Sequence, residues 1–315
     1  SITAVARQNL GRLTTFTGGF DLSSASGLEL GFDERAQAEL MSNQLKTEHY
    51  EMVLHAGDME HVMPELTYHL EDPRVGQCYP NYYVARLASK FVTVVMSGVG
   101  GDELFAGYPW RYYRQMANPG FDDYTRSYYS FWQRLVSDQD KQSLFTGPVY
   151  RSMDGHFTFD VFKDVIEPVR FDVASPDTMV NASLYFELKT FLHGLLLVED
   201  KVSMAHGLET RAPFLDNDLV DFALGLSVSS KLANLDRVVE IVDENDVGRR
   251  QRQTVPSGDG KQILRRAMGR LIPDTIVDRK KQGFSAPDAS WFRGESIDYI
   301  NKLLRNPSAR IYDYL

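Results

Sequence analysis

A glycine-rich turn between Ser97 and Tyr108 is the stretch of this sequence best suited to chemistry. The β-branched run FVTVVM, residues 91–96, leads into SGVGGDELFAGY, so a short strand ends in a Ser/Gly turn that an apolar helix start can follow. Bare backbone N–H groups at the carboxyl end of a strand bind nucleotides and phosphates in α/β proteins. The acidic pair Asp102 and Glu103 can face a phosphate only through a cation, so the turn indicates a phosphate bridged by Mg²⁺. The simpler interpretation is a tight turn with Asp102 as a helix cap.

Two further segments combine charged residues with a glycine. EDKVSMAHGLETRAPFLD, residues 199–216, places charges in a setting otherwise apolar enough for a core. Buried charges need partners, so an internal salt-bridge network that includes Glu209 and Arg211 accounts for about half of them. RKKQGFSAP, residues 279–287, joins a basic cluster to a glycine. A lysine in such a loop can neutralise charge on a leaving phosphate, whereas the simpler interpretation is a solvated basic loop.

Composition narrows the class of protein. The chain has 315 residues, of which 43% are hydrophobic, so its core can be large. Its formal net charge is -9, whereas nonspecific nucleic-acid binders are normally basic. The single cysteine, Cys78, forms no intramolecular disulfide, and we interpret it as a packing residue. His55 and His61 fit no common metal-binding spacing, so we expect them at the surface. With no signal peptide and no apolar run long enough to cross a bilayer, we predict a cytoplasmic protein without nucleic-acid or membrane partners.

Strand and helix patterns alternate in the first part of the chain. Helical patterns cover 1–10, 33–45, 59–70 and 81–90, and strand patterns cover 12–20, 50–54 and 91–96. This alternation predicts an α/β fold with a doubly wound parallel sheet. Beyond about residue 115 strand patterns thin out, 181–197 and 217–226 resemble buried helices, and 236–260 is polar enough for an exposed hairpin or loop. We therefore predict a nucleotide-binding α/β lobe over 1–116 and a mainly helical region over 117–315.

Five motifs, in sequence order, resemble the synthetase domain of the glutamine-dependent asparagine synthetases. They are TTFTGGFD, FDERAQAELMSNQLKTEHYE, SGVGGDELFAGY, EDKVSMAHGLETRAPFLD and KKQGFSAP, and they span most of the chain. The resemblance implies a pyrophosphatase-type nucleotide domain, similar to the adenine nucleotide alpha-hydrolases, with helical additions. It also implies an ATP- and Mg²⁺-dependent ligase that adenylates a carboxylate, which ammonia then attacks.

The resemblance also implies roles for individual residues. Ser97 and Gly98 would lie against the nucleotide, and Gly18 near its adenine–ribose side. Asp102 would hold the Mg²⁺ that bridges the phosphates. Lys281 would stabilise the pentacoordinate phosphorus and the departing pyrophosphate.

The acceptor side carries both matches and departures. Glu199 and Asp200 would lie near the acceptor, a small-molecule carboxylate such as aspartate. In the family, a Ser-Gly-Gly-x-Asp-Ser loop directly precedes a helix, and the segment that begins at Ser1 resembles this helix. We therefore expect a fragment that begins after the loop, stops short of the family's last helices and is inactive alone. The glutaminase domain that supplies ammonia is absent, and Cys78 cannot replace its nucleophile. Val99 stands where asparagine synthetases proper often carry Glu, and because Val cannot act as a base, another carboxylate acceptor remains open.

Two alternative functions also remain open. A β-lactam synthetase-like or peptide-cyclising amide former would keep adenylation but dispense with ammonia. A degenerate module would bind a nucleotide or a partner without turnover. The oligomeric state, including a homodimer, is open as well.

Overall fold

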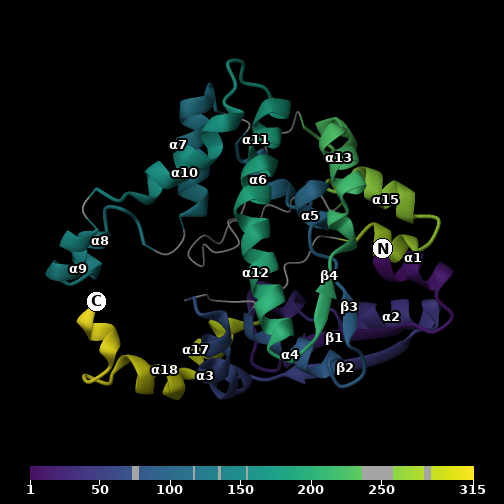
Figure 1. Ribbon diagram of the computed structural model, residues 1–315, viewed down its shortest axis with the longest axis horizontal. Coiled ribbons are helices and arrows are strands. Elements are labelled where there is room, and N and C mark those ends of the chain that lie inside the picture. The colour runs from purple at the N-terminus through teal and green to yellow at the C-terminus, as the bar shows by residue number, and fades with distance from the viewer. Residues whose placement is uncertain (73–77, 116–117, 134–135, 154, 236–257, 280–284) are drawn as a thin grey trace.

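The computed structural model describes residues 1–72, 78–115, 118–133, 136–153, 155–235, 258–279 and 285–315. The described chain is mostly helical and contains two small parallel sheets (Figure 1). In the first sheet, β1 (Thr14–Phe20) pairs with β2 (Glu48–Leu54). In the second, β3 (Val94–Met96) pairs with β4 (Glu209–Arg211).

Helices make the crossovers that parallel strand pairs require. α2 (Arg35–Leu45) makes this crossover between β1 and β2, whereas α1 (Ile2–Asn9) precedes β1, and α3 (Asp58–Leu70) and α4 (Cys78–Ala88) lie between β2 and β3. The predicted alternation of strands and helices is confirmed, and the fold is mixed α/β. A single doubly wound sheet stays a prediction, because the strands of the described residues form two separate pairs.

Helices dominate the rest of the chain. They are α5 (Gly101–Leu104), α6 (Pro109–Tyr113), α7 (Phe121–Trp132), α8 (Lys141–Leu144), α9 (Gly147–Ser152), α10 (Thr158–Ile166), α11 (Pro176–Lys189), α12 (Phe191–Met204), α13 (Asn217–Gly225), α14 (Val228–Lys231), α15 (Gln262–Met268), α16 (Asp274–Val277), α17 (Asp288–Arg293) and α18 (Ile297–Leu304). Short 3₁₀ turns cover Gly27–Gly31, Glu167–Val169, Pro213–Leu215 and Arg310–Asp313. In Figure 1, α11 and α12 follow one another through the centre, with α7 and α10 on one side of α11 and α13 on the other.

Local signals explain where the central helices start and stop. Ser175 Oγ accepts a hydrogen bond from the Thr178 N–H (3.1 Å), and Thr178 Oγ1 accepts one from the Ser175 N–H (2.9 Å). This reciprocal capping box starts α11, and Pro176 at the first position has no N–H to satisfy. The helix predicted over 181–197 is divided, because the backbone leaves helical geometry at Thr190 (φ -122°, ψ -64°). β4 follows α12 in the chain and pairs with β3. This pairing joins the predicted helical region, 117–315, to the predicted α/β lobe, 1–116.

Two apolar clusters are the largest of those that the described residues form. The cluster beside the first sheet includes Phe20, Leu54, Tyr82 and Trp291, and Cys78 packs into it as predicted. The aromatic-rich stretch that follows residue 120 contributes Tyr124, Tyr128 and Phe131 to the core of the helical region, where they join Phe162 and Phe186. Each fully buried large apolar side chain contributes about 1.5–3 kcal/mol of transfer free energy, so these clusters hold the elements around the site in place.

Candidate functional site

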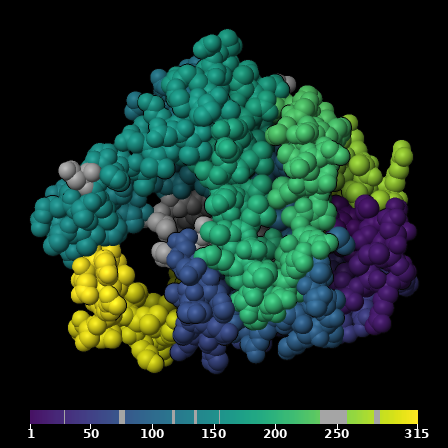
Figure 2. All heavy atoms as spheres, viewed as in Figure 1, coloured from purple at the N-terminus to yellow at the C-terminus, as the bar shows by residue number. Residues whose placement is uncertain are grey.

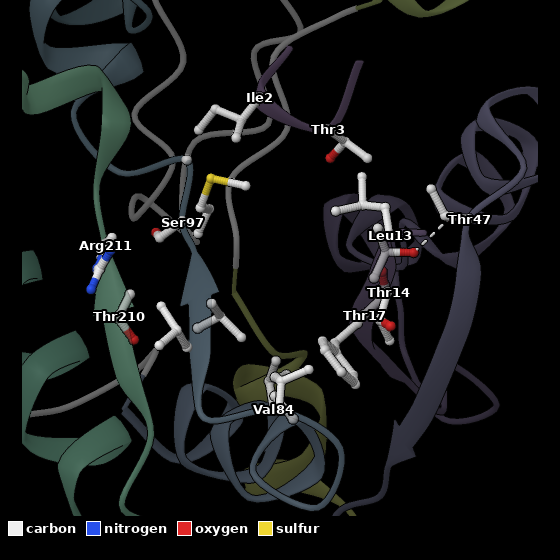
Figure 3. A pocket seen from close by; sticks show the side chains of 18 of the residues that line it. Ile2, Thr3, Leu13, Thr14, Thr17, Thr47, Val84, Ser97, Thr210 and Arg211 are labelled. Atoms are coloured by element: carbon white, nitrogen blue, oxygen red, sulfur yellow. Dashed lines mark hydrogen bonds between the residues drawn. The ribbon is translucent and has the colours of Figure 1, made fainter. Parts of the chain in front are cut away.

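A pocket with a volume of about 860 Å³ lies between the two sheets (Figure 3). Its walls come from several segments that are far apart in the sequence. Ser97, Thr210 and Arg211 lie on one side, Thr14 and Thr17 of β1 face them, and α1 and α4 contribute Ile2, Thr3 and Val84. The carboxyl end of β3, where the glycine turn begins, therefore opens into this pocket.

Steric constraints fix the shape of the turn. Gly100 has φ +91°, a conformation that residues with a Cβ rarely adopt, and a Cβ there would lie 2.5 Å from Leu215 Cδ2. A Cβ at Gly101 would lie 3.0 Å from the Phe214 ring. Gly98, in contrast, has no atom within 4 Å of its would-be Cβ. The first glycine is thus open to a ligand, and the later ones allow the turn to pack on the Pro213–Leu215 segment.

Three of the predicted residues come together in the pocket. Ser97, Gly98 and Glu199 all line it. The Ser97 N–H donates to Arg211 O (2.8 Å) and so anchors the end of β3 to β4. Ser97 Oγ accepts from the Val99 N–H (3.2 Å), and its side chain also hydrogen-bonds to Glu199. Strand β3 and helix α12, far apart in sequence, thus place a hydroxyl, a bare glycine and a carboxyl group side by side.

Glu199 is held in a weakly polar setting. Burial raises the pKa of its carboxyl group above the ordinary value, and the hydrogen bond from Ser97 opposes that rise. The arrangement can bind a positively charged or hydrogen-bonding part of a small molecule in the pocket.

Asp102 lies in the first turn of α5 and has a partner that the sequence motifs do not reveal. Its Oδ1 lies 2.7 Å from Lys261 Nζ, and the two side chains are 19% and 26% exposed. A Cβ at Gly107 would lie 1.8 Å from the same Oδ1, so the glycine at the end of the turn makes room for the carboxylate. Asp102 itself does not line the pocket described above. The only sequence signal near Lys261 is the glycine pair of SGDGK.

The other predicted residues lie elsewhere. Gly18 lies in β1 opposite Met52, and a Cβ there would lie 2.7 Å from Val84 Cγ2, so close packing of β1 on α4 also favours glycine. Asp200 is exposed on α12 and does not line the pocket. Lys281 lies outside the described residues. The roles of all three stay predictions.

Glu209 and Arg211, both predicted members of an internal salt-bridge network, form an ion pair with each other, with Arg211 Nε 2.8 Å from Glu209 Oε1. It is not internal, however, because the side chains are 56% and 65% exposed. Exposed pairs of this kind contribute at most about 1 kcal/mol to stability. The prediction of an internal network was wrong for these two residues, because both side chains are more than half exposed on β4.

In the part of the chain that the structure describes, no cluster of three or more His, Cys, Asp or Glu side chains could hold a metal ion. No helix within those residues has the length and apolar character needed to cross a membrane. Any metal at Asp102 would therefore need further ligands from a substrate, from water or from residues beyond those described.

Comparison with known proteins gives consistent matches. The chain is 25% identical to asparagine synthetase [glutamine-hydrolyzing] 1 of Bacillus subtilis over an alignment of 336 positions, which covers 99% of this chain and 48% of that protein. It is 29% identical to a putative asparagine synthetase [glutamine-hydrolyzing] of Mycobacterium tuberculosis, covering 95% of this chain and 45% of that protein. The chain thus spans about half the length of these relatives. The family model described as asparagine synthase matches residues 1–315, and the chain belongs to the asparagine synthase family.

Proposed function

We propose that this chain is the carboxylate-activating part of an ATP-dependent, amide-forming ligase of the asparagine synthetase type. It would adenylate aspartate or a related acid for attack by ammonia that a glutaminase domain releases from glutamine. The observation that carries the proposal is the meeting of Ser97, Gly98 and Glu199 at the carboxyl end of β3, the place where α/β folds bind nucleotides. The family match and the names of the relatives support it.

The residues present fit a nucleotide and a divalent cation. The open space at Gly98 lets a ligand approach the backbone. Asp102 already holds a cation, the Lys261 ammonium, at 2.7 Å, so its carboxylate is placed to attract positive charge. Oxygen ligands of this kind suit Mg²⁺, which would supply charge neutralisation for the phosphates.

The chemistry assigns each group a task. A carboxylate oxygen of the acceptor attacks the α-phosphorus of ATP, and pyrophosphate leaves. Ammonia then attacks the carbonyl carbon, loses a proton, and AMP departs with one of the original carboxylate oxygens. Ser97 and Gly98 would orient the nucleotide for in-line attack. Lys281 would offset the charge on the leaving pyrophosphate, and Glu199 would orient the acceptor.

The shape of the pocket supports the proposal that the chain acts as a fragment of a longer protein. β1 and β3 line opposite sides of it (Figure 3), and each is paired on one side only among the described residues. A further strand between them would pair with both open edges, and the pocket lies in that position. We propose that a strand preceding Ser1 lies there, and that the nucleotide binds at its end near Ser97 and Gly98.

Isotope exchange between ATP and pyrophosphate tests the assigned roles in the full-length protein. The wild type should catalyse exchange only when its acceptor acid is present. Asp102→Asn and Lys281→Ala should each lower the exchange rate about 100-fold, the usual effect of removing a charge-stabilising group. Lys281→Ala should lower the rate more than the affinity for ATP.

Two exposed residues of α10 provide matched controls: Asp164→Asn and Lys163→Ala should leave exchange unchanged. Near-normal exchange rates in both Asp102→Asn and Lys281→Ala would refute the roles proposed for these two residues. Absence of exchange with every acid, despite bound Mg-ATP, would count against the proposed function itself.

A further inference from the structure

The ion pair between Asp102 and Lys261 joins two segments that are far apart in sequence. Lys261 immediately precedes α15 and has φ +58°, a left-handed conformation that is unusual for a residue with a side chain. Its N–H donates to Phe105 O (2.9 Å). Its neighbour Gly260 packs so closely that a Cβ there would lie 2.4 Å from Ala106 O. The backbone of Lys261 is thus fixed against the turn that carries Asp102.

Positive charge gathers around this one carboxylate. Lys261 contacts Asp102 directly, and Arg265, one turn further along α15, is close enough that Asp102 favours its charged form electrostatically. Arg265 also interacts with Asp278 and Asp259, and Glu103 lies near Asp102, so Lys261 is the cation in direct contact with the Asp102 carboxylate.

We propose that Lys261 is an internal cation that occupies the metal-binding position of Asp102, and that a divalent cation must displace it. The inference rests on the proposed function, in which Asp102 binds the metal ion. Two cations cannot share Oδ1 at contact distance without strong repulsion. Lys261 would therefore keep Asp102 neutralised in the free protein and weaken its affinity for a free metal ion. A metal ion that arrives with a phosphate would be favoured, since the displaced ammonium can pair with that phosphate.

Titration of the nucleotide-free, full-length protein with Mn²⁺ tests the proposal, with bound metal measured by electron spin resonance. Lys261→Met should bind Mn²⁺ more tightly than the wild type, by on the order of tenfold, because a competing unit charge at contact distance is removed. Lys261→Gln should shift the affinity in the same direction and serves if the Met variant fails to fold. Lys261→Arg keeps the charge and should remain within about twofold of the wild type. Arg266→Met, an exposed cation on the same helix, is the matched control and should have no effect.

Asp102→Asn separates failure of this inference from failure of the proposed function. If Asp102→Asn weakens Mn²⁺ binding while Lys261→Met and Lys261→Gln leave it unchanged or weaken it, Lys261 does not compete with the metal ion and the inference is overturned. If Asp102→Asn leaves Mn²⁺ binding unchanged, Asp102 is not the metal ligand, and the metal assignment falls together with the inference. Tighter binding in both neutral variants, with weaker binding in Asp102→Asn, supports it.

Discussion

Asp288, at the start of α17, shows how burial alters a single carboxyl group in this protein. Tyr79 donates its hydroxyl proton to Asp288 Oδ1 (2.7 Å), and Glu29 lies nearby, where it accepts hydrogen bonds from Ala289 and Ser290. Burial is the main cause that raises the pKa of Asp288 to about 6, with a smaller contribution from the Glu29 charge, while the Tyr79 hydrogen bond opposes the rise. Ionised Asp288 therefore destabilises the fold at neutral pH.

Replacing Asp288 by Asn should make stability less dependent on pH. The folded pKa of about 6 lies above the unfolded value of about 3.9, so the native state binds more protons in between. The contribution of Asp288 to stability is present at low pH and is lost as the pH rises from about 4 to about 6. Asp288→Asn should thus gain stability over the wild type by about 2 kcal/mol between pH 4 and pH 7.5. Urea unfolding at both pH values measures this change.

The exposed Asp298 of α18 supplies the control, and Asp298→Asn should show a much smaller change. An equal change in both variants would show that the buried position of Asp288 has no special effect.

At the scale of single residues, the sequence predicts those site residues that lie together in one contiguous motif. Ser97 and Gly98 could be predicted because a strand and a glycine turn adjoin them, whereas Glu199 could be assigned to the site only through the family resemblance. Lys261 could not, because its function depends on a partner 159 positions away, from Asp102 to Lys261, and no motif surrounds it. Asp288 likewise depends on Tyr79 and Glu29, which only the fold brings to it.

Among the elements, strand β3 is only partly covered by its surroundings. Val94 and Met96 are 40% and 45% exposed, although strands of parallel sheets are normally buried. The Ser97 N–H donates to β4, and amide directions alternate along a strand. The amides of Val94 and Met96 therefore face away from β4, and an apolar strand edge of this kind favours pairing with another strand.

Hydrogen exchange of the β3 amides in the full-length protein tests for the proposed additional strand. If a strand pairs with the open edge, the amides of Val94 and Met96 should be as strongly protected as that of Val95, which faces β4 and serves as the internal reference. Exchange of Val94 and Met96 at least 100-fold faster than that of Val95 would mean that the edge stays open, and would contradict the proposed strand.

Element prediction succeeded where the pattern was long and failed where it was short. The β1, β2 and α1–α4 segments could be predicted because each carries several residues of regular spacing. The three residues of β4, Glu209–Arg211, show no such pattern, since pairing with β3 alone makes them a strand. The break at Thr190 between α11 and α12 was missed because apolar residues continue on both sides of it.

At the scale of the whole molecule, α12 and β4 connect the helical region to the strands that carry the site. Two distant segments of the helical region also meet: Thr146, the residue before α9, donates its N–H to Tyr314 O (2.9 Å) near the C-terminus, and the two segments touch in Figure 2. Composition and alternation predict an α/β part and a helical part, but not which elements join them. That connection places Glu199 of α12 against Ser97 of β3, and it is the basis of the proposed site.

The central claim is that the full-length protein activates a carboxylate by adenylation. The most direct measurement is the transfer of ¹⁸O from a labelled acceptor, beginning with aspartate, to the nucleotide product. We predict that AMP carries one ¹⁸O atom for each amide formed, because the carboxylate oxygen that attacks the α-phosphorus leaves with AMP. Formation of ADP, with the label in orthophosphate, would mean attack at the γ-phosphorus and would contradict the account.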